Sequence, residues 1–302
     1  MNRLLLIDGH AILHRAYHAF PPTLKTRKGE LVNAVYGFTR ILLTVLRDLA
    51  PKYTAVAFDL PEPTFRHKEF IGYQAQRPQM DAELKSQIER VKEVVQVLNI
   101  PIFSMSGYEA DDVIGTLAHQ ASKKTEVIIV TGDKDIMQLV DQKIKVFAPI
   151  KGTAEGEIFD RQKVKEFLGI SPQQIIDYKA LVGDPSDNYP GVPGIGPKTA
   201  VQLLEKYHDL KNIFRHLLEI KPLVAQKLKD GRQSALLSQK LATIVTKVPI
   251  KIDLKACKVH DYDQEKAVKL FEELEFKSLI NKLPGWKKPA EPKTGPEQKK
   301  LF

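Results

Sequence analysis

The sequence predicts an α/β fold with a mainly parallel central sheet flanked by helices, followed by a second half built of helices. Two observations carry this prediction. Over the first 160 residues, short apolar runs typical of buried strands alternate with helical patterns, and beyond them only helical patterns continue. Strands that alternate with helices are typical of a parallel sheet covered on both faces. The expected strands are residues 3–7, 54–58, 101–104, 127–131 and, with a weaker pattern, 144–147.

Three helices are expected between these strands. Residues 32–49 are apolar on most sides, which is typical of a helix inside the core. Residues 82–98 place Ile88, Val91 and Val95 on one face and charged side chains on the other. Residues 111–121 repeat that amphipathic pattern. Each of these helices is therefore expected to pack on the sheet.

The second half divides into short helices and a polar tail. The helices are expected at residues 161–168, 172–181, 197–207, 223–229, 234–244 and 264–274. Residues 284–302 are rich in Pro, Lys and Glu, a composition typical of disorder. We therefore expect an α/β domain over residues 1–160, a helical domain over 161–283 and a disordered tail over 284–302.

Composition limits the classes of protein that fit. A net charge of +9 in 302 residues favours an anionic partner, most commonly nucleic acid. The one cysteine, Cys257, excludes an internal disulfide and a cysteine-based zinc site, and it fits a reducing cytoplasm. The first apolar run stops at Asp8 and is too short for a signal peptide. No apolar run approaches the roughly 20 residues of a membrane span. A cytoplasmic protein without membrane contact is expected.

Acidic residues follow the expected strands at their carboxyl ends. Ligands of open parallel sheets bind outside these ends, so we expect the carboxylates to converge there. Two further acids lie in the helical half, within Gly-Asp-Pro-Ser-Asp-Asn. The whole set is Asp8, Asp59, Glu109, Asp111, Asp112, Asp133, Asp135, Asp184 and Asp187.

Such a group of carboxylates predicts bound cations. Like charges raise one another's pKa and destabilise the fold unless cations neutralise them. Hard oxygen ligands without His or Cys suit Mg²⁺ or Mn²⁺, and two such ions about 4 Å apart catalyse phosphodiester hydrolysis. Taken singly, Asp111, Asp112 and Asp133 are better explained as caps at helix starts, but that explanation does not account for the whole set. A single calcium-binding loop does not fit, because the acids are spread from residue 8 to residue 187.

The segments around these acids resemble the 5′ nuclease domain of bacterial DNA polymerase I, a family that includes phage 5′ nucleases and flap endonucleases. The resemblance implies a PIN-like fold with a helical arch at about residues 61–82 and a helix-hairpin-helix region that binds DNA. It assigns one group of acids mainly to a first metal ion: Asp8, Asp59, Glu109, Asp111 and Asp112. It assigns the rest mainly to a second ion: Asp133, Asp135, Asp184 and Asp187.

The helix-hairpin-helix is expected at residues 191–200, before a helix that begins at Pro197. Glycines allow a tight turn, and the free N–H groups of a helix start bind phosphate. An ordinary turn between helices is the alternative, and a dinucleotide-binding turn fails because no strand precedes it. The resemblance also implies K⁺ at this turn. The expected DNA contacts are Gly191, Gly194, Gly196, Lys198 and Thr199.

The arch interleaves cations with aromatic rings, which suits contact with single-stranded DNA. A solvated amphipathic helix is the alternative. The expected contacts are Arg66, Lys68, Tyr73, Gln74 and Arg77. Arg77 is expected to steady phosphate charge in catalysis.

Two positions depart from the family pattern. Gln74 stands where the family typically has lysine, and His14 stands where it often has a tyrosine that stacks on DNA. His14 and its neighbour Arg15 are still assigned to DNA. These departures put the rate of catalysis in question and leave metal binding unaffected.

The expected function is that of a 5′→3′ exonuclease and flap endonuclease, which cuts DNA and RNA primers in replication and repair. The main alternative is a module that binds branched DNA with little nuclease activity, and a weaker one is a nuclease specific for RNA. Expected partners are a DNA polymerase and a sliding clamp, since Gln298, Leu301 and Phe302 resemble clamp-docking peptides. A random tail end explains the same residues. A stand-alone protein and a fragment of a polymerase both fit the sequence.

Overall fold

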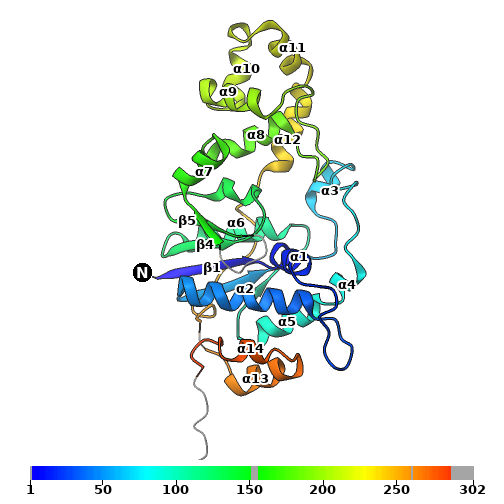
Figure 1. The fold of residues 1–302 in the computed structure, drawn as a ribbon. Coiled ribbons are helices and arrows are strands. Elements are labelled where there is room, and N and C mark those ends of the chain that lie inside the picture. The colour runs from blue at the N-terminus through cyan, green and yellow to red at the C-terminus, as the bar shows by residue number, and fades with distance from the viewer. Residues whose placement is uncertain (1, 151–155, 260, 287–302) are drawn as a thin grey trace, which may run out of the picture.

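A computed structural model describes residues 2–150, 156–259 and 261–286. Its centre is a six-stranded sheet with the order β3-β2-β1-β4-β5-β6 (Figure 1). Four neighbouring pairs are parallel, and β6 runs antiparallel to β5. The strands are β1 Arg3–Asp8, β2 Tyr53–Ala57, β3 Ile102–Phe103, β4 Glu126–Val130, β5 Ile144–Pro149 and β6 Gly156–Phe159. The five expected strands and the mainly parallel sheet are confirmed, and β6 is an addition.

Strand β1 shows why the sheet is covered on both faces. Successive side chains of a strand point to opposite faces. Leu4 and Leu6 accordingly belong to one buried cluster, while Leu5 and Ile7 belong to another. All four side chains are at most 2% exposed. A continuous apolar run is therefore what a central parallel strand needs.

Helices form the layers on the two faces. The cluster with Leu5 and Ile7 receives α1 (Gly9–Ala19), α2 (Asn33–Leu49) and α5 (Ile88–Val97), and the other receives α6 (Ala110–Ala121). The core helix expected at 32–49 is confirmed as α2. No helix within the described segments is long and apolar enough to cross a bilayer.

The prediction of one helix over residues 82–98 is wrong. The chain instead forms α4 (Ala82–Lys85) and then α5, with a break before Ile88. Gln87 at the break is 1% exposed, and its Oε1 accepts hydrogen bonds from the N–H groups of Ala34 and Val35. The side chain thus satisfies two free N–H groups in the first turn of α2, a long-range role that periodicity does not reveal.

The helical region extends from the sheet toward the top of Figure 1. Its helices are α7 Arg161–Leu168, α8 Ile175–Val182, α9 Pro197–Tyr207, α10 Leu210–Arg215, α11 Pro222–Asp230 and α12 Arg232–Ala242. Helices α7 and α9 have the bounds expected from sequence. The two regions share a core, because Leu181 and Leu204 belong to the same buried cluster as Leu4.

The end of the described chain returns to the α/β region. Helices α13 (Gln264–Glu273) and α14 (Lys277–Ile280) lie below α2 and α5, at the opposite end from α9–α11 (Figure 1). Phe271 and Leu279 are fully buried in the cluster around α2. Residues 161–283 are therefore not one spatial unit, which differs from the expected domain division. Of the expected disordered tail, residues 287–302 lie outside the described part.

Candidate active site at the carboxyl edge of the sheet

Four carboxylates, here called the sheet-edge acids, gather where the parallel strands end. They are Asp8, Asp59, Glu109 and Asp111. Asp8 ends β1, Asp59 follows β2, and the other two lie at the start of α6. Their charges act on one another: Asp8, Asp59 and Glu109 all contribute to raising the pKa of Asp111. The structure therefore brings these expected residues together.

Asp8 is held rigidly at this edge. Its Oδ1 accepts a hydrogen bond from the N–H of Ala11 at 3.0 Å and thereby caps α1. Its Oδ2 accepts one from the Thr131 hydroxyl at 2.8 Å. Burial raises the pKa of Asp8 to about 6, and the charges of Asp59 and Asp133 act in the same direction. The charged form is therefore costly here without a cation.

Asp59 is the sheet-edge acid that ionises most readily. Burial opposes its charge, but the imidazole of His10 and the N–H of Ala110 outweigh it, so the pKa of Asp59 lies below its ordinary value. The Ala110 hydrogen bond measures 2.7 Å. This bond also joins the end of β2 to the start of α6, which places Asp59 beside Glu109.

The pKa values of Glu109 and Asp111 are both raised, so their charged forms are disfavoured in the protein without a cation. Burial is the main cause in both cases, and it raises the pKa of Glu109 to about 7 despite the nearby guanidinium of Arg66. The pKa of Asp111 is raised well above its ordinary value, and after burial Asp133 is the largest contributor. Two half-buried carboxyl groups with raised pKa values at a strand edge are typical of functional sites.

Three further carboxylates, here called the outer acids, are Asp135, Asp184 and Asp187. They offer oxygens that lie within 4.8 Å of one another, close enough to hold one metal ion. Asp133 lies between the two groups, since its charge acts on both Asp111 and Asp135. It also accepts a hydrogen bond from the N–H of Asp135 at 2.8 Å.

The outer acids already have one cationic partner that sequence reasoning missed. Lys179 of α8 places its Nζ 2.7 Å from an Asp135 oxygen and also pairs with Asp184. Burial and Asp133 raise the pKa of Asp135, which Lys179 limits to about 6. A lysine on a short helix is ordinarily solvated, so its position in the sequence carried no signal for this contact.

Asp112 and Arg66 differ from their sequence-based assignments to metal and DNA. They form a buried ion pair with two N···O contacts, of 2.7 and 2.9 Å. Asp112 is 0% exposed and also accepts hydrogen bonds from the N–H groups of Glu109 and Val245. Its oxygens are therefore fully engaged, and Arg66 is too buried for contact with DNA in this structure.

Two arch residues face the acids rather than the surface. Tyr73 is 3% exposed, and its hydroxyl lies 3.2 Å from a Glu109 oxygen and 3.4 Å from an Asp187 oxygen. Gln74 has a left-handed backbone (φ 55°) and donates a hydrogen bond from Nε2 to Asp187 at 3.0 Å. Both side chains therefore support the acids, which for Tyr73 replaces the expected contact with DNA.

The remaining expected contacts with single-stranded DNA lie nearer the surface. Lys68, Arg77 and His14 are exposed. The charge of Arg77 favours the ionised forms of Asp59 and Asp187, which places its guanidinium near both groups of acids. Partial burial and the neighbouring cations lower the pKa of His14, which favours a neutral imidazole.

The glycine-rich turn precedes α9 as expected, with Gly196 as N-cap and Pro197 as first residue. Gly191 is required for packing, because a Cβ there would lie 2.2 Å from the backbone nitrogen of Gly183. It is buried, which differs from its expected contact with DNA. Gly194, Gly196 and Lys198 are exposed, and Thr199 is half-buried.

A lysine ammonium already occupies one of the carbonyl oxygens that K⁺ would need at this turn. Carbonyl oxygens are the ligands that the turn would offer to such an ion. The ammonium of Lys227 already donates to the Gly194 carbonyl oxygen at 3.1 Å. A side chain of the protein thus supplies a cation to the turn.

A mainly parallel sheet with carboxylates gathered along its carboxyl edge suits a metal-dependent hydrolase, and the family match makes the class a nuclease. The chain belongs to the 5′-3′ exonuclease family. Its residues 3–169 match the N-terminal resolvase-like domain of that family. Residues 170–265 match its C-terminal SAM fold.

Two of the similar proteins are bacterial DNA polymerases. The DNA polymerase I of Chloroflexus aurantiacus is 43% identical over 289 residues, which cover 93% of this chain and 31% of that protein. The DNA polymerase I of Bacillus caldotenax is 41% identical over 284 residues, which cover 93% of this chain and 32% of that protein. The chain spans about a third of the length of these relatives.

Solved structures share the fold at low sequence identity. A bacteriophage T5 D15 flap endonuclease, in a pseudo-enzyme-product complex with DNA and metal ions, has a TM-score of 0.68 at 19% identity. The likeness covers 91% of this chain and all of that one. The catalytic core of Rad2 in complex with DNA substrate has a TM-score of 0.61 at 16% identity. Here 93% of this chain and 92% of that one are covered. These likenesses confirm the PIN-like nuclease fold.

Proposed function

We propose that this protein is a structure-selective 5′→3′ exonuclease and flap endonuclease that hydrolyses phosphodiester bonds with two divalent metal ions. The observation that carries the proposal is the convergence of the sheet-edge acids and the outer acids around Asp133. The raised pKa values of Asp8, Glu109, Asp111 and Asp135 mean that these four acids lack sufficient compensation from the protein itself. A site that gathers this many carboxylates gains most from small, hard cations.

The residues divide between the two proposed ions. The sheet-edge acids would hold the first ion, and Asp133 with the outer acids would hold the second; Asp112, committed to Arg66, is left out of this set. Bound Mg²⁺ or Mn²⁺ supplies a Lewis acid for the scissile phosphate and lowers the pKa of a water ligand. Asp8 and Asp59 are positioned by hydrogen bonds with Ala11, Thr131 and Ala110, so their oxygens need little reorganisation.

The DNA would run across the edge under the arch. Arg77 pairs with the phosphate near the cut, and Lys68 and His14 contact the single strand by charge and stacking. The start of α9, with Gly194, Gly196, Lys198 and Thr199, binds the backbone of the duplex without sequence preference. This arrangement selects junctions between single-stranded and duplex DNA, because the arch binds a single strand and the start of α9 binds a duplex.

The cellular role that we propose rests on the similarity to DNA polymerases and to a flap endonuclease. Two of them are DNA polymerases, and one similar structure is a flap endonuclease with DNA and metal ions. We propose the removal of RNA primers and damaged strands in replication and repair, in concert with a polymerase. Docking on a sliding clamp would use Gln298, Leu301 and Phe302, which lie outside the described residues. The buried thiol of Cys257, whose pKa burial raises to about 11, suits a reducing cytoplasm.

Cleavage of three labelled substrates tests this function. Purified protein with Mg²⁺ is incubated with a 5′ flap, a nicked duplex and single-stranded RNA, and each reaction is repeated in EDTA. We expect metal-dependent cleavage of the flap and the nicked duplex. Binding of the flap without any cleavage would favour the DNA-binding module instead, and cleavage of RNA alone would favour the RNA nuclease.

A further inference from the structure

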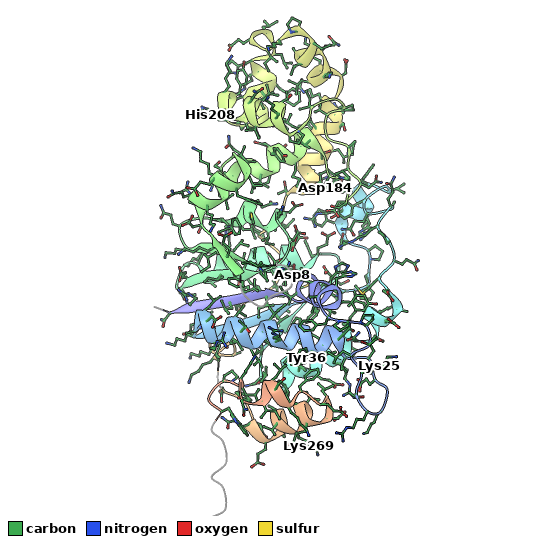
Figure 2. The ribbon with its side chains drawn as sticks, viewed as in Figure 1. Asp8, Lys25, Tyr36, Asp184, His208 and Lys269 are labelled. Atoms are coloured by element: carbon green, nitrogen blue, oxygen red, sulfur yellow. The ribbon has the colours of Figure 1, made fainter. Side chains whose placement is uncertain are left out.

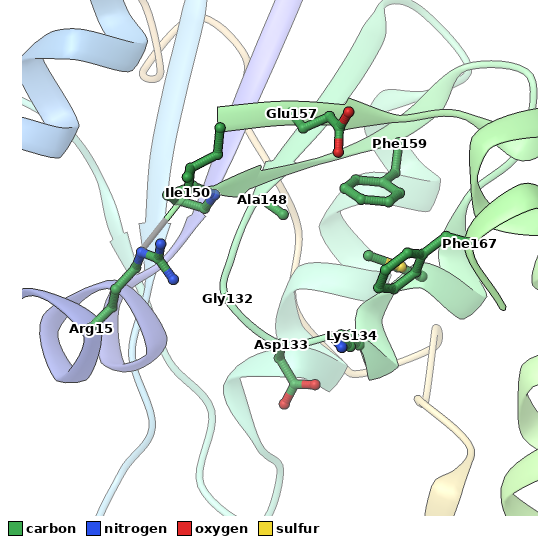
Figure 3. Close-up of a pocket in the computed structure, with 11 residues that line it drawn as sticks. Arg15, Gly132, Asp133, Lys134, Ala148, Ile150, Glu157, Phe159 and Phe167 are labelled. Atoms are coloured by element: carbon green, nitrogen blue, oxygen red, sulfur yellow. The ribbon is translucent and has the colours of Figure 1, made fainter. Parts of the chain in front are cut away.

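A pocket of about 250 Å³ opens beside the acids, where α1, the turn after β4, the β5–β6 strands and α7 meet. Arg15, Asp133, Lys134, Phe159 and Phe167 are among its lining residues (Figure 3). Asp133 belongs to the proposed metal site, so the pocket adjoins the place of reaction. Phe159 and Phe167 have no role in the function proposed above.

One side of the pocket is aromatic. Phe167 of α7 is 49% exposed, so about half of this large apolar side chain is open to solvent. Its ring meets Phe159 edge-on, with centroids 5.4 Å apart. The ammonium of Lys134 lies 4.9 Å from the centroid of the Phe167 ring. A rigid, half-exposed ring with a neighbouring cation is the kind of platform on which unpaired nucleobases stack.

The other side of the pocket is cationic. In Figure 3 the guanidinium of Arg15 projects from α1 toward the pocket, across from Phe167 and with Asp133 between them. Nη2 of Arg15 is buried, and no acceptor for it lies within the described segments. A buried donor without a partner is costly, and a guanidinium binds phosphate through two parallel N–H groups. An anionic group entering from the acidic edge would satisfy it.

The charge and the volume of the pocket limit the kinds of ligand that can bind in it. Glu157 at the rim is paired with Lys163, so its charge is compensated. Arg15 and Lys134 then face the negative charge of Asp133, which the proposed metal ion would neutralise. The volume lies below the roughly 300–1,000 Å³ of sites for drug-sized ligands, which suits one nucleotide unit. Bases inside a duplex are stacked on both faces, so only an unpaired nucleotide offers a free face to Phe167.

We propose that this pocket receives one unpaired nucleotide next to the scissile phosphate, with its base on Phe167 and its phosphate on Arg15. This inference rests on the proposed function, because it takes the single strand to pass the acids. It adds a subsite that fixes the register of the strand relative to the metal ions. The position of cleavage is then set partly by Phe167, a residue that contacts no acid in the proposed metal site.

Fluorescence of 2-aminopurine locates such a nucleotide. The probe is placed singly at successive positions around the branch of a 5′-flap substrate whose linkages near the branch cannot be hydrolysed. Binding to the full chain is followed in Mg²⁺, so that the proposed metal ions are present and no cleavage occurs. We expect stacking on Phe167 to change the fluorescence strongly at one position beside the branch. Phe167→Leu keeps the apolar contact with Phe159 but removes the ring face, so the signal at that position should be lost. Flap affinity should fall about tenfold, the loss expected for one base–aromatic stack.

A matched control separates stacking from general damage. Phe214 of α10 also has a cation over its ring, with Arg232 at 5.4 Å, and Phe214→Leu should leave the signal beside the branch unchanged. Thermal melting of each variant establishes that it is folded. A signal that is unchanged in Phe167→Leu would overturn the subsite, even when the wild type cleaves flaps in Mg²⁺. Failure of the wild type to cleave flaps would instead overturn the proposed function.

Discussion

Arg66 and Asp112 form an ion pair inside the protein, with N···O distances of 2.7 and 2.9 Å and side chains that are 3% and 0% exposed. Arg66 also donates to the carbonyl oxygens of Leu241 and Thr243, each at 2.8 Å. One guanidinium therefore joins α3 (Phe65–Glu69), which lies in the expected arch, to the start of α6 and the end of α12. The relative position of the arch and the acids depends on this contact.

Arg66→Ala should destabilise the fold by about 3–5 kcal/mol, because it leaves the buried Asp112 without its counter-charge. The free energy of unfolding from urea titration measures this loss. Lys68→Ala, two residues along the same helix but exposed, is the control and should change stability by less than about 0.5 kcal/mol. Equal stabilities for the two variants would show that the pair does not hold the arch.

Metal-free protein should become less stable as the pH rises from about 5 to about 7.5. Asp8, Asp135 and Glu109 have raised pKa values of about 6, 6 and 7, so the folded state binds more protons than the unfolded state in this window. The lowered pKa of His14 acts in the opposite direction, but it concerns one exposed imidazole.

Thermal melting across this pH range, with and without Mg²⁺, measures the effect. Added Mg²⁺ should stabilise the protein most at the alkaline end, where the carboxylates are ionised and the ion binds the folded state. Melting temperatures that rise steadily with pH in EDTA would show that these carboxyl groups do not have raised pKa values in the folded protein.

Gln74→Lys should speed cleavage about tenfold, because a cation aimed at the developing charge of the phosphate lowers the barrier more than a neutral amide does. Gln74 already contacts Asp187, so the new ammonium would lie beside the second proposed ion. Single-turnover rates on a 5′ flap at saturating enzyme measure the effect, with Arg77→Ala as the reference for a lost cation. An unchanged rate in Gln74→Lys, with activity abolished in Arg77→Ala, would make Arg77 the sole phosphate cation.

Lys198→Ala should weaken binding to duplex-containing substrates and lower the slope of log affinity against log salt by about one unit. Lys198 is exposed at the start of α9. Lys269, exposed on α13 at the other end of the molecule (Figure 2), provides the matched Lys→Ala control and should leave the slope unchanged. The same slope for both variants would leave Lys198 without a role at the hairpin.

Much of the fold could be predicted because burial leaves a local signature. The runs that end at Ile7 and Val130 are apolar over the length of a strand. Asp8 follows the first run directly, and Asp133 lies three residues after the second. Parallel strands place their ends at one edge, so the convergence of Asp8, Asp59 and Asp111 followed from chain order alone. In Figure 2, Asp8 lies at the end of the sheet and Asp184 toward the helical region, as that order requires.

The contacts between distant segments could not be predicted in the same way. Nothing local to Arg66 distinguishes it from the exposed Lys68, yet one is buried against Asp112 and the other is solvated. Lys179 reaches the outer acids only because α8 packs beside them. The helical pattern at residues 264–274 predicted α13, but it did not indicate the surface against which this helix packs. Such choices depend on tertiary partners.

Cleavage by Asp111→Asn is the measurement that tests the central claim, that the acids at the sheet edge hold catalytic metal ions. The charges of four other acids act on its carboxylate, and the amide keeps its size but removes its charge. Turnover and affinity are measured on the same 5′ flap in Mg²⁺, with Asp209→Asn at the start of α10 as the control. We predict that Asp111→Asn loses cleavage while its affinity for the flap stays the same or increases, because repulsion of the phosphates falls. Retention of more than about a tenth of the wild-type turnover would contradict the metal site.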